Sequence, residues 1–178
     1  MNKPTTILSD EHQNILKVIE TLDRECNALD SGGNLDKPFF EKAVDFIQNY
    51  ADKFHHAKEE DILFIEICKD SVQMHCNPTQ QMLYEHDQGR NFVKGLIEGL
   101  SEENTKKIIE NVRGYAALLR DHIYKEDNIL FPMADEALPQ EIQESILERF
   151  HKAETEKFSE GTKEKYLSIV KDFKERNC

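Results

Sequence analysis

Two copies of one short motif carry the residues with the clearest capacity for chemistry. The sequence at 55–64, His-His-Ala-Lys-Glu-Glu-Asp-Ile-Leu-Phe, recurs at 122–131 as His-Ile-Tyr-Lys-Glu-Asp-Asn-Ile-Leu-Phe. Aligned on the closing Ile-Leu-Phe, the copies pair His55 with His122 and Glu59 with Glu126. Residues four apart on a helix share one face, so each copy offers an imidazole and a carboxylate that point the same way. Two such pairs facing each other across a helical bundle would form a cage for two metal ions.

Each part of this pattern also has an ordinary structural interpretation. A single His-x-x-x-Glu pair is most often a solvated pair on a helix surface. A lone histidine on an apolar stripe, such as His12 or His86, is most often a hydrogen-bonded core residue. The repetition of the pair, and the convergence of further polar residues on it, favour a metal site over these alternatives.

Helical periodicity continues through nearly the whole chain, and no run of residues alternates as a strand would. The expected bundle helices span about 7–30, 37–69, 78–99 and 102–131, and one or two peripheral helices follow at about 139–176. Asp36 is expected to open the second helix and Pro132 to end the fourth. The sequence therefore predicts an all-α fold, an up-down-up-down four-helix bundle with additional C-terminal helices. We expect a single domain at 1–178, with the bundle core at about 5–135.

The connections between the expected bundle helices are short, so successive helices should be antiparallel neighbours. His12 and His86 lie early in the first and third helices, whereas His55 and His122 lie late in the second and fourth. These positions are at the same end of an up-down bundle. Six core-facing residues are therefore expected at one level: His12, His55, Glu59, His86, His122 and Glu126.

A core layer of four imidazoles and two carboxylates is expensive unless something compensates for their burial. Imidazole is a suitable ligand for iron, copper, nickel and zinc, and carboxylates can bridge two cations. Two divalent ions bring four positive charges, while two glutamates and a bridging hydroxide bring three negative ones. The resulting site would be nearly neutral, which a buried position can tolerate.

Four neighbouring residues need a separate interpretation. Glu60, Asp127 and His56 each directly follow a proposed ligand, so they lie about 100° further around an α-helix. We expect Glu60 and Asp127 at the surface or behind the ligands. His56 has no histidine counterpart in the second copy. It is expected to support a ligand from behind or, as the less favoured alternative, to be a fifth histidine ligand. Tyr115 lies on the fourth helical stripe, where it either packs in the core or donates a hydrogen bond to a species held at the metals.

Composition excludes several classes of function. A net charge of -12 in 178 residues argues against nucleic acid and against an anionic membrane surface as partners. No apolar run approaches the roughly 20 residues of a membrane span, and the N-terminus lacks the layout of a signal peptide. The cysteines form no Cys-x-x-Cys motif, which argues against thiolate zinc sites; they are Cys26, Cys68, Cys76 and Cys178. We therefore expect a cytoplasmic protein with reduced, inert thiols.

The motifs at these positions resemble those of the hemerythrin-like family, also called HHE cation-binding domains, over roughly residues 5–160. The resemblance rests on 55–64, on 119–132, on Glu85-His86-Asp87-Gln88-Gly89-Arg90 and on Glu11-His12. It implies an up-down four-helix bundle with a non-haem di-iron centre, bridged by carboxylates and by an oxo or hydroxo group. Carried over position by position, the terminal ligands would be His12, His55, His86 and His122, and the bridging ligands Glu59 and Glu126.

Oxygen-carrying hemerythrins use a fifth histidine, with two histidines on one metal and three on the other. No fifth histidine stands at a matching position in this sequence, which leaves room for water or an exogenous ligand. The resemblance implies a protein that binds or senses oxygen, nitric oxide or a related small ligand, or that handles iron. The alternatives are an enzyme that reduces peroxide or nitric oxide or repairs iron centres, and a structural or regulatory site for zinc, manganese or iron. A sensor or an enzyme would need a redox or signalling partner protein, and whether the protein is an enzyme is left open.

Overall fold

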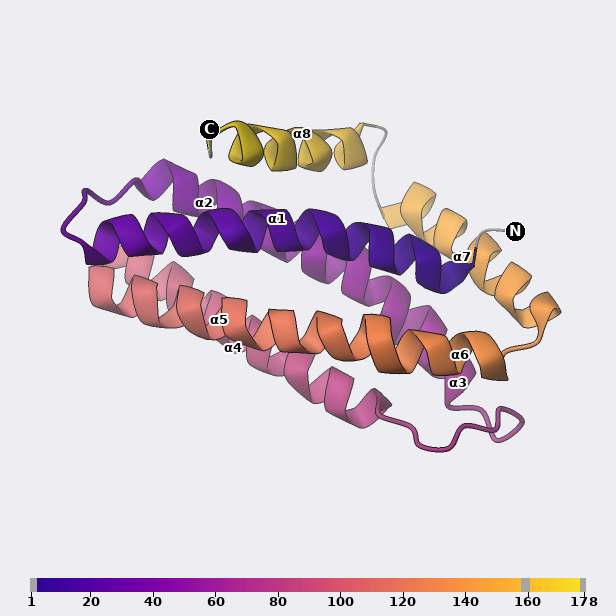
Figure 1. The fold of residues 1–178 in the computed structure, drawn as a ribbon. Coiled ribbons are helices and arrows are strands. Elements are labelled where there is room, and N and C mark those ends of the chain that lie inside the picture. The colour runs from indigo at the N-terminus through magenta and orange to yellow at the C-terminus, as the bar shows by residue number, and fades with distance from the viewer. Residues whose placement is uncertain (1–2, 158–160, 177–178) are drawn as a thin grey trace.

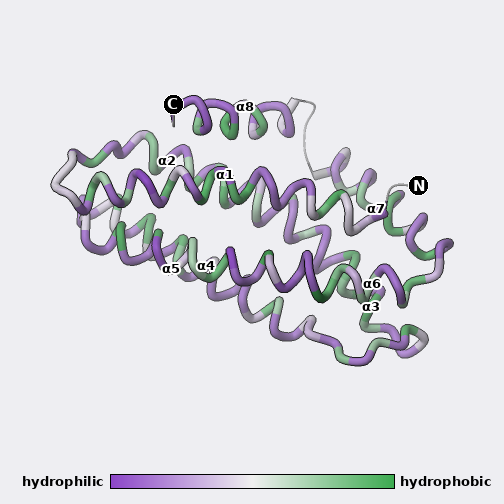
Figure 2. The backbone as a smooth tube through the Cα atoms, in the orientation of Figure 1, coloured by the Kyte–Doolittle hydropathy of each residue, from purple (hydrophilic) through white to green (hydrophobic). Residues whose placement is uncertain are grey.

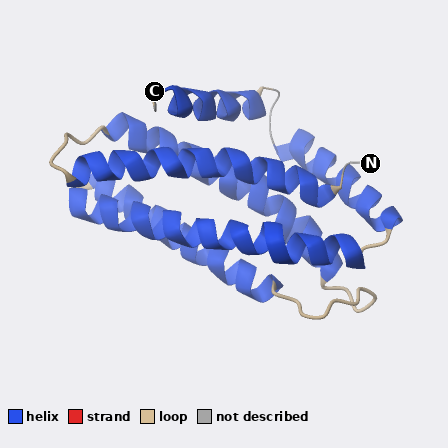
Figure 3. Cartoon of the chain, in the orientation of Figure 1, coloured by secondary structure: helices blue, strands red, loops and turns tan. Residues whose placement is uncertain are grey.

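A computed structural model describes residues 3–157 and 161–176, and these residues form helices without any strand (Figure 3). The elements are α1 (Pro4–Asp30), α2 (Lys37–Phe46), η1 (Ile47–His56), η2 (Glu59–Leu63), α3 (Phe64–Ile67), α4 (Thr79–Ser101), α5 (Thr105–Lys125), η3 (Glu126–Leu130), α6 (Phe131–Ala137), α7 (Gln140–Lys157) and α8 (Thr162–Glu175). The elements named η are π-helical, with the wider turn of i→i+5 hydrogen bonding. The expected all-α bundle is confirmed.

Four long antiparallel rods form the bundle (Figure 1). The second rod is built from α2, η1, η2 and α3, and the fourth from α5, η3 and α6. Each rod packs against two others, because α1 contacts α5 and η1, while α4 contacts α5 and α2. The rods thus surround one central axis, on which residues from all four can meet.

Side-chain caps set where two of the rods begin. The Asp36 carboxylate accepts a hydrogen bond from the Phe39 N–H at 3.1 Å, and the Asn104 side chain accepts one from the Lys107 N–H at 3.1 Å. Both residues satisfy backbone donors that a helix start leaves free. The expected opening of the second rod at Asp36 is therefore confirmed.

The expected end of the fourth rod at Pro132 is wrong. The helix continues through this proline to Ala137, directly after the π-helical turn of η3. A proline inside an α-helix removes one hydrogen bond and presses its ring against the preceding turn. The wider turn before Pro132 is where the helix accommodates this change, so the proline continues the rod instead of ending it.

The apolar core is divided into two clusters. One cluster reaches along the bundle from Ile15 and Phe54 to Leu100, and the other contains Leu8, Met82 and residues of α3, α6 and α7. The coloured tube of Figure 2 shows hydrophobic positions recurring along each rod. On α1, His12 stands between Leu8 of one cluster and Ile15 of the other, so a polar layer separates the two apolar regions.

The two C-terminal helices lie outside the four rods and cover them (Figure 1). Their break at Gly161 follows the expectation, since this residue has a φ of 84°, a left-handed conformation that favours glycine. They also contribute buried side chains to the bundle: Ile146 and Phe150 join the smaller apolar cluster, and α8 joins the larger. Within the described residues, no helix combines the length and apolarity needed to cross a membrane.

Candidate metal centre

All six residues that the sequence pattern places at one level of the core meet in the polar layer. Each is at most 1% exposed; they are His12, His55, Glu59, His86, His122 and Glu126. The histidines come from four different rods, and the two glutamates begin the π-helical segments η2 and η3. The structure thus brings together the residues proposed as ligands.

Glu59 lies between histidines of different rods. Its Oε1 atom is 3.3 Å from His55 Nε2 and 3.8 Å from His12 Nε2, whereas its Oε2 atom is 3.5 Å from His86 Nε2. The two carboxylate oxygens therefore face two different groups of imidazoles. This is the placement needed for a carboxylate that bridges two cations.

Glu126 has a similar position on the opposite side of the layer. Its Oε2 atom lies 3.3 Å from His12 Nε2 and 3.1 Å from His122 Nε2. This glutamate also contacts one histidine on each side of the layer. Each motif copy therefore supplies one buried carboxylate that contacts histidines of two rods.

Potential ligand atoms gather in two clusters, within each of which they lie within 4.8 Å of one another. One cluster contains His12, His55, Glu59 and Glu126, and the other contains His56, Glu59, His86 and His122. Glu59 belongs to both. The clusters together contain five imidazoles, divided two and three.

His56, which the sequence left open as a candidate for a fifth histidine ligand, lies in the second cluster. Its ring stacks on that of His86, with centroids 3.8 Å apart and an angle of 13° between the planes. The helix is π-helical through His56, and its wider turn brings both His55 and His56 to the core side. An α-helical turn would have placed them about 100° apart. The spacing Asp52-x-x-x-His56 was the only local signal for this position, since the pair lies 3.3 Å apart.

A carboxylate stands behind every one of the five imidazoles. The Nδ1 contacts are His12 with Asp127 at 2.9 Å, His55 with Glu11 at 3.0 Å, His56 with Asp52 at 3.3 Å, His86 with Glu60 at 2.6 Å and His122 with Glu85 at 2.9 Å. Each carboxylate can accept an Nδ1–H, which leaves Nε2 as the nitrogen available to a metal; in the metal-free protein the Nε2 atoms of His86 and His122 lie 3.0 Å apart and share a hydrogen bond. Glu60 and Asp127 were expected either at the surface or behind the proposed ligands. The structure places both behind them, Glu60 at His86 and Asp127 at His12. Glu11 and Glu85 had not been assigned a role, although each directly precedes a ligand histidine.

Several buried polar atoms of the layer have no hydrogen-bond partner in the described part of the chain. They are Nε2 of His12 and His55 and both carboxylate oxygens of Glu59 and Glu126. Buried polar atoms are almost always paired, because an unpaired one loses its solvation without compensation. All six atoms belong to residues of the first cluster, of which Glu59 also belongs to the second, and nitrogen and carboxylate donors suit divalent transition metals. The residues present therefore fit bound metal.

The electrostatics of the layer also favour positive charge at its centre. Burial lowers the pKa of His55, but Glu59 and Glu11 outweigh it and raise this pKa to about 10. Burial likewise opposes protonation of His122, yet Glu126 and Glu85 raise its pKa to about 10. Without a metal, protons on these imidazoles balance the carboxylates; a bound cation would replace those protons.

Two lysines extend the pattern beyond the carboxylates and show its approximate twofold symmetry. Lys58 precedes Glu59 and bonds to Glu11, just as Lys125 precedes Glu126 and bonds to Glu85. Lys58 is 1% exposed, because α7 covers it and contributes Glu154 at 2.9 Å from its Nζ. Lys125 is 34% exposed at its side chain and has no such cover. The symmetry is broken at His56, whose counterpart is Ile123.

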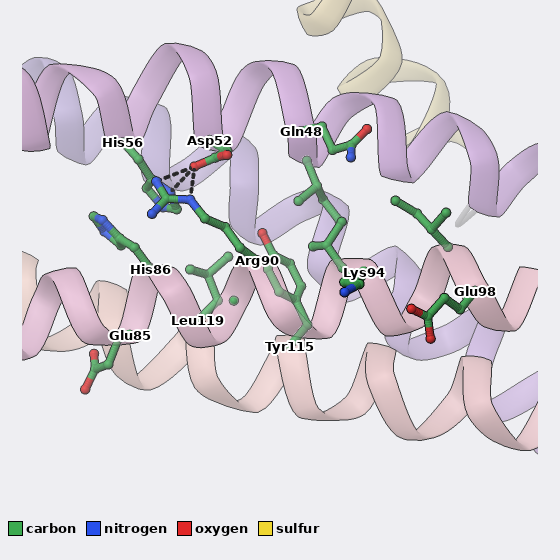
Figure 4. Close-up of a pocket in the computed structure, with 14 residues that line it drawn as sticks. Gln48, Asp52, His56, Glu85, His86, Arg90, Lys94, Glu98, Tyr115 and Leu119 are labelled. Carbon is green, nitrogen blue, oxygen red and sulfur yellow. Dashed lines mark hydrogen bonds and ion pairs between the residues drawn. The ribbon is translucent and has the colours of Figure 1, made fainter.

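Tyr115 lies beside the second cluster and outside both sets of ligand atoms. Its side chain lines a cavity together with His56 and His86, and its buried hydroxyl has no hydrogen-bond partner in the described residues (Figure 4). Burial raises the pKa of Tyr115, so the hydroxyl keeps its proton and can act as a donor.

Comparison with known protein families finds one match. Residues 3–134 match the family model described as Hemerythrin HHE cation binding domain, a span that covers the four rods up to α6. The helices α7 and α8 lie beyond the matched segment. No curated protein and no solved structure matches the chain.

Proposed function

Since the chain belongs to the hemerythrin HHE cation-binding family, for which a metal cofactor, typically iron, is implied, we propose that it holds a non-haem di-iron centre that binds or senses oxygen, nitric oxide or a related small ligand, or handles iron. The observation that carries the proposal is the set of unpaired buried atoms around the shared Glu59. Iron fits this donor set because imidazole and carboxylate are both suitable ligands for it.

The proposed assignment follows the two clusters. His12 and His55 would hold one ion, and His56, His86 and His122 the other. Glu59, which belongs to both clusters, and Glu126, which contacts His12 and His122, would bridge them. The five carboxylates behind the imidazoles fix the ring orientations and keep each Nε2 directed inward. When bound, the ions would supply an open coordination position and a reversible change of oxidation state.

The division of the histidines into two and three supports ligand binding as the leading function. It is the division that the resemblance associates with oxygen carriage, and His56 supplies the third imidazole on the second ion. An imidazole-rich set donates little negative charge, so it stabilises high-valent iron less well than a carboxylate-rich set. We propose that the protein acts in the cytoplasm, which agrees with the free thiols of Cys26, Cys68 and Cys76.

A second candidate is an enzyme that reduces peroxide or nitric oxide or repairs iron centres. The unpartnered hydroxyl of Tyr115 beside His56 and His86 favours it, because this hydroxyl could donate a proton or a hydrogen bond near the second ion. Such an enzyme would need electrons from a redox partner protein.

Metal analysis of protein purified without oxygen tests the proposal. We expect about two irons per chain, with loss of iron in His55→Ala and full retention in His151→Ala, whose parent histidine is exposed. Zinc, manganese or no metal in the native protein would contradict the di-iron centre and favour a structural or regulatory site. Visible spectra with oxygen, peroxide, azide and nitric oxide then separate the two candidates: a stable adduct supports binding, whereas turnover supports an enzyme.

A further inference from the structure

A cavity of about 380 Å³ opens beside the second cluster, between η1, α4 and α5. In Figure 4, His56 and His86 stand at one end of it, and Lys94 and Glu98 stand toward the other. The latter two are exposed, as is Ile97 beside them, so this end faces solvent. The cavity therefore connects the surface with the three-histidine side of the metal centre.

The cavity is larger than a diatomic ligand requires. A water molecule occupies roughly 30 Å³ in the liquid, so the cavity has the volume of about thirteen such molecules. Pockets for small organic ligands begin at about 300 Å³. The size thus points to an organic molecule.

The polar groups of the wall restrict the chemistry of that molecule. Arg90 is already engaged by Asp52 and Glu60, each at 2.7 Å, and by Asp87 at 2.9 Å. The carboxylates of Asp52 and Glu85 are engaged in turn, the first by Arg90 and the second by Lys125 and His122, so these groups offer a ligand neither a free cation nor a free anion. Much of the remaining wall is apolar, with Ile47, Val93, Leu119 and the ring of Tyr115. An uncharged and mainly apolar occupant suits this lining best.

Tyr115 supplies a buried, directional contact. It is 4% exposed, its hydroxyl has no hydrogen-bond partner in the described residues, and in Figure 4 this hydroxyl points into the cavity between Arg90 and Lys94. A buried hydroxyl without a partner is costly, so an oxygen acceptor placed there would be favourable.

We propose that this cavity binds an uncharged, mainly apolar organic molecule with one hydrogen-bond-accepting oxygen, which receives the O–H of Tyr115. Phenols, alcohols and ketones of modest size belong to this class. The proposal goes beyond the di-iron centre and does not require that the metal be iron.

Fluorine NMR titrations of the full chain with 4-fluorophenol and with fluorobenzene test it. The hydroxyl compound should bind about fivefold more tightly, as expected for one net hydrogen bond. Tyr115→Phe should remove most of this preference while leaving fluorobenzene binding unchanged. Saturable binding of neither compound, or a preference that survives in Tyr115→Phe, would overturn the proposal.

A pair of matched variants locates the site. Ile97→Trp places a large ring at the solvent end of the cavity and should weaken 4-fluorophenol binding at least fivefold, on the same hydrogen-bond scale or beyond it. Ile65→Trp introduces the same ring at an exposed position that does not line the cavity and should leave binding unchanged. Equal effects of the two substitutions would contradict the assignment. The iron content of every sample is measured, and the titrations are repeated after metal removal. Absence of iron would then count against the di-iron centre, whereas absence of 4-fluorophenol binding would count against the cavity proposal.

Discussion

At the scale of single residues, the position of a carboxylate on its helix decides whether it faces the centre of the polar layer or a histidine Nδ1 behind it. Glu59 and Glu60 are neighbours, yet the first faces the imidazole Nε2 atoms of both clusters and the second accepts a hydrogen bond from His86 Nδ1. Glu126 and Asp127 repeat the arrangement around His12. Adjacent acidic residues therefore have different functions.

The first prediction uses this pair. Glu59→Ala should abolish binding of both ions, because its carboxylate belongs to both clusters. Glu60→Ala should retain both ions with roughly 10–100-fold weaker affinity, the usual loss when a group behind a metal ligand is removed. Chelator competition on both variants measures the difference. If Glu60→Ala loses both ions and Glu59→Ala keeps them, the assignment of the motif is reversed.

His56 connects the residue scale to the helix that carries it. It faces the second cluster because η1 is π-helical through this residue. The second prediction is that His56→Ala lowers the iron content from about two toward one per chain, because only the three-histidine side loses a ligand. Metal analysis measures it, with His75→Ala as the control at an exposed histidine. Two tightly held irons in His56→Ala would show that this imidazole is not a ligand.

At the scale of elements, the regular parts of the fold follow from the sequence and the irregular parts do not. The rods are predictable because apolar residues recur with the helical period, and His12 and His86 reach the correct level because antiparallel rods of similar length align their ends. The π-helical segments have no comparable pattern. They coincide with the two places where the structure departs from the regular helical expectation, His56 and the course of the chain through Pro132.

The carboxylates behind the histidines were predictable only in part. Glu60 and Asp127 stand next to ligands in the repeated motif, so a role near the site could be expected. Glu11 and Glu85 support histidines on neighbouring rods, and such pairings between distant segments cannot be read from local spacing. The repetition of Glu-His in the first and third rods marks these two glutamates but does not indicate which histidine each one contacts.

At the scale of the whole molecule, the C-terminal helices make the two halves of the site unequal. Lys58 lies between Glu11 and Glu154, and its Nζ is 3.8 Å from the centroid of the Phe54 ring. Its counterpart Lys125 remains partly in solvent. The helix α7, which lies outside the matched family segment, therefore buries the charge network behind one side of the site only.

The third prediction compares these two lysines. Lys58→Ala should lower the free energy of unfolding by about 1–3 kcal/mol, because the buried carboxylate of Glu11 loses one of its two partners and keeps His55 as the other. Lys125→Ala should cost about 1 kcal/mol or less, because solvent can replace a partly exposed partner. Chemical denaturation of both variants measures the difference. Similar costs for the two would show that the cover provided by α7 has no energetic consequence.

The fourth prediction concerns the balance of charge in the whole site and its dependence on pH. In the folded, metal-free protein the pKa values of His55 and His122 are raised to about 10, whereas an unfolded chain has values near 6.5. A group whose pKa is higher in the folded than in the unfolded state contributes its full stabilisation of the fold at pH values below the unfolded pKa. That contribution is lost as the pH rises through the folded pKa. The free energy of unfolding of the metal-free protein should therefore fall between about pH 6.5 and pH 10, by on the order of a few kcal/mol.

Metal should remove this dependence, because a bound cation takes the place of the protons on the two imidazoles. Denaturation curves at several pH values, with and without bound metal, compare the two forms. The exposed His151→Ala variant is the control and should retain the metal-free profile. A metal-free protein whose stability stays constant or rises across this window would mean that its carboxylates are balanced by something other than protonated His55 and His122.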